Sequence, residues 1–98
     1  MKILLVCSMG MSTSLLVEKM KQFADEEDSI KAVGLTDYKK EVDNGNVETL
    51  LVGPQVKMRF KEISNYCEPK GIRVELIDTL VYGRMNGEAA MQIAKGAF

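Results

Sequence analysis

The chain opens with MKILLVCSMGMSTSLLV (residues 1–17), a stretch whose character changes twice. Residues 3–6 are apolar without interruption, which is typical of a strand covered on both faces. Residues 8–13 are turn-forming, and from Ser12 onward the apolar side chains follow helical spacing. The stretch therefore predicts a strand, a tight loop and a helix whose N-cap is Ser12 or Thr13.

The same order of strand and helix repeats along the rest of the chain. Further strands are predicted at 31–36, 48–53 and 71–78, and further helices from Pro54 to Glu68 and from Asn86 to about Lys95. The polar segment 37–46 has room for a helical turn or two, and 79–87 is predicted to be a loop. The buried faces of the three helices are predicted to be Leu16, Met20 and Phe23, then Val56, Phe60, Ile63 and Cys67, and finally Ala90, Ile93 and Ala97.

This alternation decides the fold class. It predicts an α/β protein with one open parallel sheet, helices on both faces and right-handed crossovers. The 98 residues contain neither a linker nor an internal repeat, so residues 1–98 are predicted to form a single domain.

Composition narrows the classes of function. The net charge is −1 with both signs interspersed, which argues against nucleic acid or an anionic membrane as a partner. The longest apolar runs have about five residues, far fewer than the ~20 that span a bilayer, so a cytoplasmic protein is expected. The chain has no histidine, which excludes Ser-His-Asp and Cys-His catalysis, and its two cysteines form no zinc pattern. Neither a metal nor an organic cofactor is predicted.

The loop after the first strand is the predicted functional site. In an open parallel sheet, ligands bind beyond the carboxyl ends of the strands. A loop that runs into a helix N-terminus points several N–H groups into one concavity, and the helix dipole adds partial positive charge. Gly10 lets this backbone curl. The predicted phosphate-binding loop consists of Ser8, Met9, Gly10, Met11, Ser12, Thr13 and Ser14.

Cys7 lies at the base of this predicted phosphate-binding loop. The same donors favour a thiolate, so Cys7 is predicted to be a nucleophile that carries a phosphoryl group. The alternative interpretation is a small buried residue that ends the strand, and Cys67 is predicted to be core in that way. The loop lacks the lysine of an ATP- or GTP-binding loop and the glycine pattern of a dinucleotide site. A flavin site is disfavoured because aromatic residues are few and scattered.

The sequence resembles a known family, the lactose/cellobiose-type IIB components of the phosphoenolpyruvate-dependent sugar phosphotransferase system. The resemblance covers nearly the whole chain and is carried by residues 1–17, by LLVGPQV at 50–56 and by IDTLVYGRMNG at 77–87. It implies a four-stranded sheet of order 2-1-3-4. It also implies that Cys7 accepts a phosphoryl group from a phosphohistidine of a IIA partner and passes it to a disaccharide held by the membrane IIC component. The sequence does not identify the disaccharide.

The loop of that family is similar to the C-x₅-R-[ST] loop of low-molecular-weight tyrosine phosphatases. Here the position six after Cys7 is Thr13, so the arginine that holds a transferring phosphoryl group bidentately is absent. This departure suits a relay that does not lose its phosphoryl group to water. Two alternatives stay open: a cysteine-dependent phosphatase or arsenate-reductase-like enzyme, and a non-catalytic domain that binds a partner through an anion-holding loop.

Two partners would have to reach an exposed phosphocysteine in turn, so a flat rim is expected around the loop. Met9 and Met11 are either partner contacts on this rim or core residues. Further rim candidates at the same end of the sheet are Gln55, Asp78, Tyr82 and Gly83. Tyr82 and Gly83 would form a mobile lid or part of the docking rim. Asp78 is either a general acid or, in the favoured interpretation, a cap for its neighbours.

Overall fold

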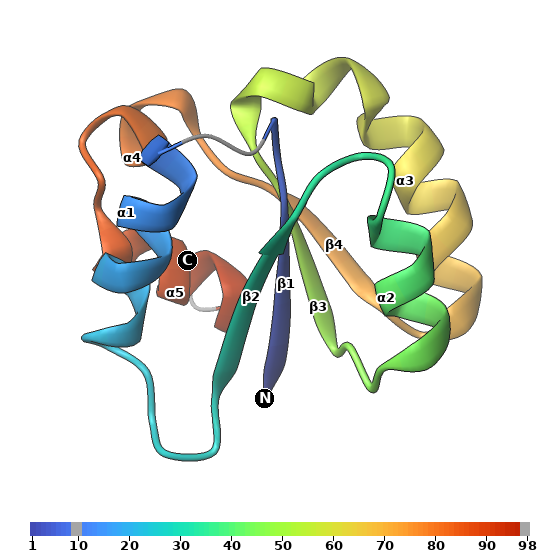
Figure 1. Cartoon of the computed structure of the whole chain (residues 1–98), viewed down its shortest axis with the longest axis horizontal. Helices are drawn as coiled ribbons and strands as arrows, with labels where there is room; N and C mark the ends of the chain where they lie inside the picture. Colours follow the sequence, from blue (N-terminus) through green and yellow to red (C-terminus); the bar gives the residue numbers. More distant parts are fainter. Residues whose placement is uncertain (9–10, 97–98) are drawn as a thin grey trace.

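The computed structural model of the chain describes residues 1–8 and 11–96, with Met11 and Ser12 described by their backbone alone. Its four strands are β1 (Lys2–Val6), β2 (Ser29–Val33), β3 (Thr49–Val52) and β4 (Arg73–Leu76). All neighbouring strands pair in parallel and the order across the sheet is β2-β1-β3-β4 (Figure 1). The predicted parallel sheet is therefore confirmed, together with the strand order that the resemblance implied.

The helices cover both faces of this sheet. Helices α1 (Met11–Lys21), α4 (Thr79–Gly83) and α5 (Gly87–Lys95) pack on one face. Helices α2 (Tyr38–Asn44) and α3 (Phe60–Cys67) pack on the other (Figure 1). Two 3₁₀ helices, η1 (Pro54–Arg59) and η2 (Glu68–Lys70), flank α3. None of the helices in the described part of the chain is long and apolar enough to cross a bilayer.

The alternation of side chains along β1 divides the core into two halves. Leu4 and Val6 face α2 and α3, whereas Ile3 and Leu5 face α1 and α5. All four side chains are at most 2% exposed, which confirms the prediction of a strand buried on both faces. Cys7 continues this alternation and joins the half that α1 covers.

Helix α4 is the largest difference from the sequence prediction, because residues 79–87 were expected to be a loop. Asp78 is its N-cap, and the Asp78 carboxylate accepts a hydrogen bond of 2.7 Å from the backbone N–H of Leu80. The prediction was wrong because a helix of five residues is too short to show a 3.6-residue periodicity. The helix carries Tyr82, which is buried.

Helix α1 also differs at both ends from the prediction. It begins at Met11, so Ser12 and Thr13 lie inside its first turn and are not its N-cap. It ends at Lys21, so Phe23 falls outside the helix and is 49% exposed, although it was predicted to complete the buried face. Leu16 and Met20 are fully buried as predicted.

The later helices follow their predicted faces more closely. The predicted helix from Pro54 begins as η1, and α3 starts only at Phe60 because Val56 has non-helical dihedrals. Asn86 caps α5 as predicted, since its side-chain oxygen accepts a hydrogen bond from the N–H of Ala89. The predicted inner-face residues Val56, Ile63, Cys67 and Ala90 are buried, while Phe60 and Ile93 are partly buried and Ala97 lies outside the described residues.

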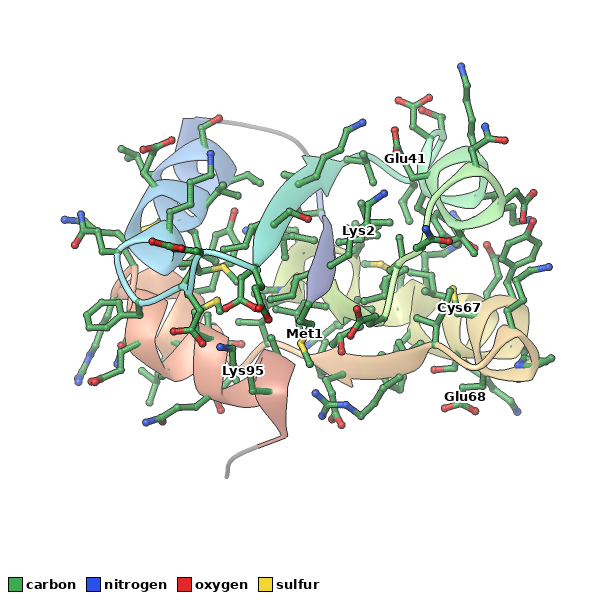
Figure 2. All side chains as sticks on the ribbon, turned by 90° about the horizontal axis from the view of Figure 1, so that it is seen from below. Met1, Lys2, Glu41, Cys67, Glu68 and Lys95 are labelled. Atoms are coloured by element: carbon green, nitrogen blue, oxygen red, sulfur yellow. The ribbon has the colours of Figure 1, made fainter. Side chains whose placement is uncertain are left out.

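An ion-pair network closes the amino-terminal edge of the sheet, opposite the predicted site. The Asp28 carboxylate lies 3.1 Å from the α-amino group of Met1 and 2.8 Å from Lys95 Nζ (Met1 and Lys95 are labelled in Figure 2). The Asp28 side chain is only 4% exposed. The hydrogen bond from Lys95, followed by that from the Asp25 backbone N–H, holds the pKa of Asp28 well below its usual range.

We expect Asp28→Asn to lower the free energy of unfolding by about 1–3 kcal/mol at pH 7, because partly buried and exposed hydrogen bonds to a charged group are lost. Since the folded-state pKa is depressed, this contribution is complete above the unfolded pKa of about 4 and is lost as the pH falls below it. Urea unfolding of both proteins from pH 7 to pH 3 should therefore show the difference shrinking. Glu18→Gln, which removes an exposed pair with Lys21, is the control. A difference that stays constant over this range would contradict the assignment.

Candidate functional site

Cys7 sits at the carboxyl edge of the sheet, directly after β1. Its backbone N–H donates a hydrogen bond of 3.1 Å to the carbonyl of Val33 at the end of β2. On the other side, the N–H of Gly53 donates a hydrogen bond of 2.8 Å to the carbonyl of Val6. The backbone at Cys7 is thus held by both neighbouring strands, four residues before α1 begins.

The sulfur of Cys7 belongs to a short chain of buried hydrogen bonds. Cys7 Sγ lies 2.9 Å from Thr13 Oγ1, which in turn lies 2.9 Å from the hydroxyl of Tyr82. Cys7 is 0% exposed, Thr13 is 1% exposed and Tyr82 is 6% exposed. The expectation of a shallow, exposed sulfur is therefore wrong for this structure. The cause is the alternation along β1, which turns Cys7 toward the face that α1 covers.

Thr13 occupies the position where the phosphatase loop has arginine. The first turn of α1 brings its hydroxyl back onto the sulfur of Cys7. The hydroxyl is small enough to be buried at this point, where a guanidinium group would bring a charge into the core. The sulfur is consequently contacted by a neutral hydrogen-bonding group that can act as donor or acceptor.

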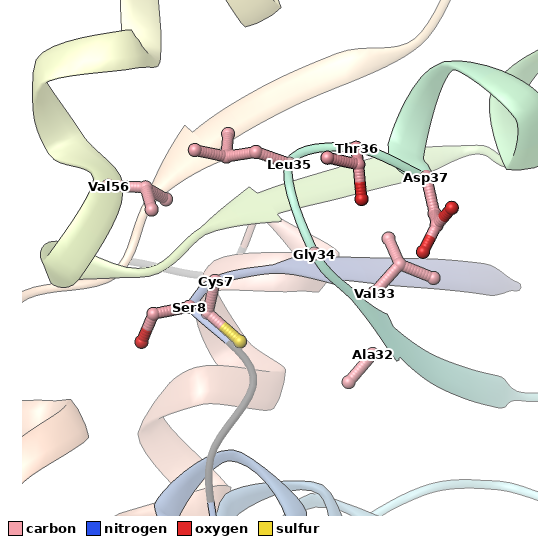
Figure 3. A pocket seen from close by; sticks show the side chains of 9 residues that line it. All are labelled: Cys7, Ser8, Ala32, Val33, Gly34, Leu35, Thr36, Asp37 and Val56. Atoms are coloured by element: carbon pink, nitrogen blue, oxygen red, sulfur yellow. The ribbon is translucent and has the colours of Figure 1, made fainter.

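A cavity of about 530 Å³ opens beside Cys7 (Figure 3). Cys7 and Ser8 border it at the end of β1, and the segment 34–37 borders it after β2. The remaining lining residues are Ala32, Val33 and Val56. The segment 34–37 was missed as part of the site because the strand was predicted to continue to residue 36. β2 ends at Val33, which frees the segment to line the cavity.

The structure describes only some of the other predicted loop residues. Ser8 and Ser14 are exposed. Met9 and Gly10 lie outside the described residues, as do the side chains of Met11 and Ser12. Within the described part of the chain, no three His, Cys, Asp or Glu side chains gather as metal ligands.

The four rim candidates do not share one environment. Gln55 is exposed on η1, and Gly83 is exposed at the end of α4. Asp78 is exposed and caps α4, in agreement with the favoured interpretation. Tyr82 was expected to be a lid or a rim residue, and this is wrong because its ring is buried among the residues between α1, α4 and the sheet. No sequence pattern indicated its contact with Thr13, which lies 69 residues away.

Gly53 is a further site residue that the sequence reasoning did not single out. A Cβ atom at this position would lie 2.9 Å from the Cβ of Cys7 and 2.9 Å from the side-chain oxygen of Gln55. Carbon atoms in contact normally lie about 3.5–4.0 Å apart. The missing side chain therefore allows β3 to pass close beside Cys7 and brings the Gln55 amide near it. A glycine that ends an apolar strand just before Pro54 was the signal available in the sequence.

Gly53→Ala is expected to lower the free energy of unfolding by about 1–3 kcal/mol, because the new methyl group overpacks against Cys7. Gln55 can move aside, whereas Cys7 is fixed by its backbone hydrogen bonds. Urea unfolding measures the stability, and the rate of Cys7 alkylation reports whether the sulfur has shifted. Gln55→Ala combined with Gly53→Ala separates the two contacts. If the double variant regains wild-type stability, the clash lies with Gln55 and the packing against Cys7 is refuted.

Comparison with known proteins places this geometry in a family. The family model described as "PTS system, Lactose/Cellobiose specific IIB subunit" matches residues 2–93. The chain is 45% identical over 96 residues to the oligo-beta-mannoside-specific EIIB component of Bacillus subtilis, covering 95% of this chain and 91% of that protein. It is 32% identical over 100 residues to the galactose-specific EIIB component of Lactococcus lactis subsp. cremoris, covering 95% of this chain and 92% of that protein.

Two solved structures have the same fold. The cellobiose-specific phosphotransferase IIB component from Borrelia burgdorferi superposes with a TM-score of 0.76 at 40% identity, over 100% of this chain and 91% of that one. The lactose-specific IIB component domain from Streptococcus pneumoniae gives a TM-score of 0.78 at 16% identity, over 100% and 97% of the two chains, which supports the fold alone. The chain, with Cys7 at the carboxyl edge of its sheet, belongs to the lactose/cellobiose-specific IIB family of the sugar phosphotransferase system.

Proposed function

We propose that the chain is a phosphocarrier whose covalent acceptor is Cys7. In this proposal a phosphohistidine of a IIA protein is the donor, and a disaccharide bound by a membrane IIC component is the final acceptor. Family membership supports a role in sugar phosphotransfer. The single observation that carries the choice of residue is the position of Cys7 at the carboxyl edge of the sheet, with the first turn of α1 folded onto its sulfur.

Both phosphoryl transfers, onto Cys7 and from Cys7 to the sugar, can proceed without a cofactor. In the first, the sulfur of Cys7 attacks phosphorus, the S–P bond forms and the N–P bond of the phosphohistidine breaks. The thiol proton ends on the imidazole nitrogen that is released. In the second, a sugar hydroxyl attacks phosphorus, the O–P bond forms and the S–P bond breaks, and the hydroxyl proton returns to the sulfur. Because the donor imidazole comes from the partner, the absence of histidine in this chain fits the proposal.

The N-terminus of α1 would stabilise the negative charge of the phosphoryl group. The N–H groups at the start of a helix have no partner within the helix, and here these include the amides of residues 11–13. Together with the helix dipole they favour a phosphoryl group that carries close to two negative charges. Thr13 and Ser14 can add hydroxyl donors. Without the arginine of the phosphatase loop, attack by water on the S–P bond gains less charge stabilisation, which suits a carrier.

The cavity beside Cys7 gives incoming groups a route to the sulfur. Its volume of about 530 Å³ exceeds what an imidazole ring or one sugar ring needs, and Cys7 lies in its wall. The sulfur itself is covered in this structure. Transfer therefore requires the Thr13 side chain to move away from the sulfur or to rotate together with it. We infer that the structure represents the unphosphorylated protein at rest and not the form that meets a partner.

The sugar is proposed only as a class. The relatives are named for oligo-beta-mannoside, galactose and cellobiose, and the family model is named for lactose and cellobiose, which are both disaccharides. A disaccharide acceptor therefore rests on the family and not on a majority of these relatives. Transfer to a sugar that a membrane component has taken up would take place on the cytoplasmic side. The contacts that distinguish one sugar from another would belong to the IIC component.

The experiment that tests the proposal compares two reactions of the purified chain. Incubation with phosphorylated IIA protein should load about one phosphoryl group per chain, since one sulfur is the acceptor. Incubation with p-nitrophenyl phosphate should give little turnover, because the charge stabilisation of a phosphatase loop is missing. Rapid, repeated hydrolysis of the aryl phosphate without uptake from IIA would instead assign the chain to the cysteine-dependent phosphatases.

A further inference from the structure

Tyr82 is the feature of the site that the transfer chemistry leaves unused. Its hydroxyl lies 2.9 Å from Thr13 Oγ1 and does not reach the sulfur directly. The ring is 6% exposed and packs in the same apolar cluster as Cys7 and Leu16. A buried tyrosine normally places its hydroxyl where it has a hydrogen-bond partner, and here that partner is the residue that contacts the nucleophile.

The fold fixes where this hydroxyl lies. Tyr82 is on α4, and its backbone N–H donates a hydrogen bond of 3.0 Å to the carbonyl of Asp78. The Asp78 side chain caps the same helix through the N–H of Leu80. α4 packs against α5, which in turn packs against α1. The Tyr82 hydroxyl is therefore held by elements outside the phosphate-binding loop.

The proton order along the three groups follows from their chemistry. Thr13 has one hydroxyl proton, which can point toward the sulfur or toward Tyr82. A phenol is the more acidic of the two hydroxyls and the better donor, so Tyr82 donates and Thr13 accepts. The proton of Thr13 is then left for Cys7, where a charge-assisted hydrogen bond to a thiolate is strongest. The chain of donors runs from Tyr82 through Thr13 to the sulfur.

We propose that Tyr82 is a positioning residue that acts through Thr13, orienting the Thr13 hydroxyl toward Cys7 Sγ and, after transfer, toward the phosphoryl group on it. The proposal rests on the phosphocarrier function, in which that sulfur is the acceptor. The Tyr82 hydroxyl forms its hydrogen bond with Thr13, and Thr13 in turn contacts the sulfur. The hydrogen bond of Tyr82 prevents the Thr13 side chain from turning away from the sulfur. Helix α4, which lies outside the phosphate-binding loop, thereby becomes part of the transfer site.

The test measures alkylation of Cys7 by iodoacetamide as a function of pH, read from the Cys7 peptide by mass spectrometry. The plateau rate reports access to the sulfur, and the pH midpoint reports how well the thiolate is stabilised. Tyr82→Phe keeps the buried ring and should raise the midpoint by about 0.5–1 pH unit. Thr13→Val should raise it by about 1–2 units, since the direct donor is lost. Thr13→Ser keeps a hydroxyl and should restore the wild-type midpoint.

The double variant distinguishes positioning from a merely structural role. If Tyr82 acts only through Thr13, Thr13→Val with Tyr82→Phe has the midpoint of Thr13→Val alone. Asp37 is a titratable residue that lines the same cavity as Cys7, and it is unchanged in every variant. Tyr66→Phe is the matched control, because the Tyr66 hydroxyl bonds to Asp43 on the opposite face of the sheet.

Two outcomes overturn the inference: an unchanged midpoint in Tyr82→Phe, or shifts that add in the double variant. Its failure is separable from failure of the phosphocarrier function. If wild-type protein takes up no phosphoryl group from phosphorylated IIA, the function fails whatever the alkylation midpoints are. If wild-type protein is loaded on Cys7 and Tyr82→Phe keeps the wild-type midpoint, only the role of Tyr82 is refuted.

Discussion

Cys7→Ser is expected to lower phosphoryl uptake from phosphorylated IIA protein by about 10³-fold or more, because the nucleophile is removed while the rest of the site remains. An alkoxide is not accessible at neutral pH, whereas a thiolate is. The serine hydroxyl can still form a hydrogen bond with Thr13, so the strand–loop–helix unit should keep its structure. Phosphoprotein gels and intact-protein mass spectrometry measure the uptake.

Cys67→Ser is the matched control for this substitution. Cys67 is fully buried at the end of α3, on the opposite face of the sheet from the Cys7 side chain. Burial raises the pKa of the Cys67 thiol to about 11, so it remains protonated and unreactive at neutral pH. The Cys67→Ser protein should therefore load with phosphoryl groups as the wild type does. Full loading of folded Cys7→Ser protein, or loss of loading in folded Cys67→Ser protein, would contradict the assignment.

Gly87→Ala is the second substitution for which we expect a large effect, this time on stability. Gly87 begins α5 and is buried against the end of α1. A Cβ atom here would lie 2.6 Å from the backbone N of Met20 and still closer to the carbonyl group of Lys19. Neither backbone group can move without shifting α1, so we expect a loss of about 3 kcal/mol in the free energy of unfolding. Urea or thermal unfolding measures it.

Gly83→Ala offers a control with the same chemical change. Gly83 ends α4, and a Cβ atom there would meet nothing within 4 Å. Alanine at an open helical position is expected to be neutral or to stabilise the protein by up to about 1 kcal/mol. Equal effects of the two substitutions would show that α5 does not pack on α1 as closely as described.

The sequence was sufficient for those parts of the fold that repeat a simple pattern. The uninterrupted apolar run at residues 3–6 predicted a central strand, and the helical spacing from Leu16 to Met20 predicted the face of α1. The alternation of elements then predicted a parallel sheet, which placed Cys7 at the edge where such folds bind ligands. These predictions succeeded because local periodicity and burial agree along these segments.

The parts that failed depend on contacts between distant segments. No local pattern indicates that Tyr82 reaches Thr13, because the contact depends on how α4 packs beside α1. The exposure of Phe23 depends on where α1 ends, and the segment 34–37 lines the cavity only because β2 ends at Val33. The sequence offers burial of Cys7 as an alternative to a functional role, yet the residue is buried and also borders the cavity.

The role of Cys7 as phosphoryl acceptor is tested most directly by locating the phosphoryl group after incubation with phosphorylated IIA protein. Fragmentation of the loaded chain by mass spectrometry, under conditions that preserve S–P bonds, assigns the modified residue. We expect a single phosphoryl group, on the sulfur of Cys7, that disappears when the IIC component and a disaccharide are added. A phosphoryl group on any other residue, or none on Cys7 in folded wild-type protein, would contradict this role of Cys7.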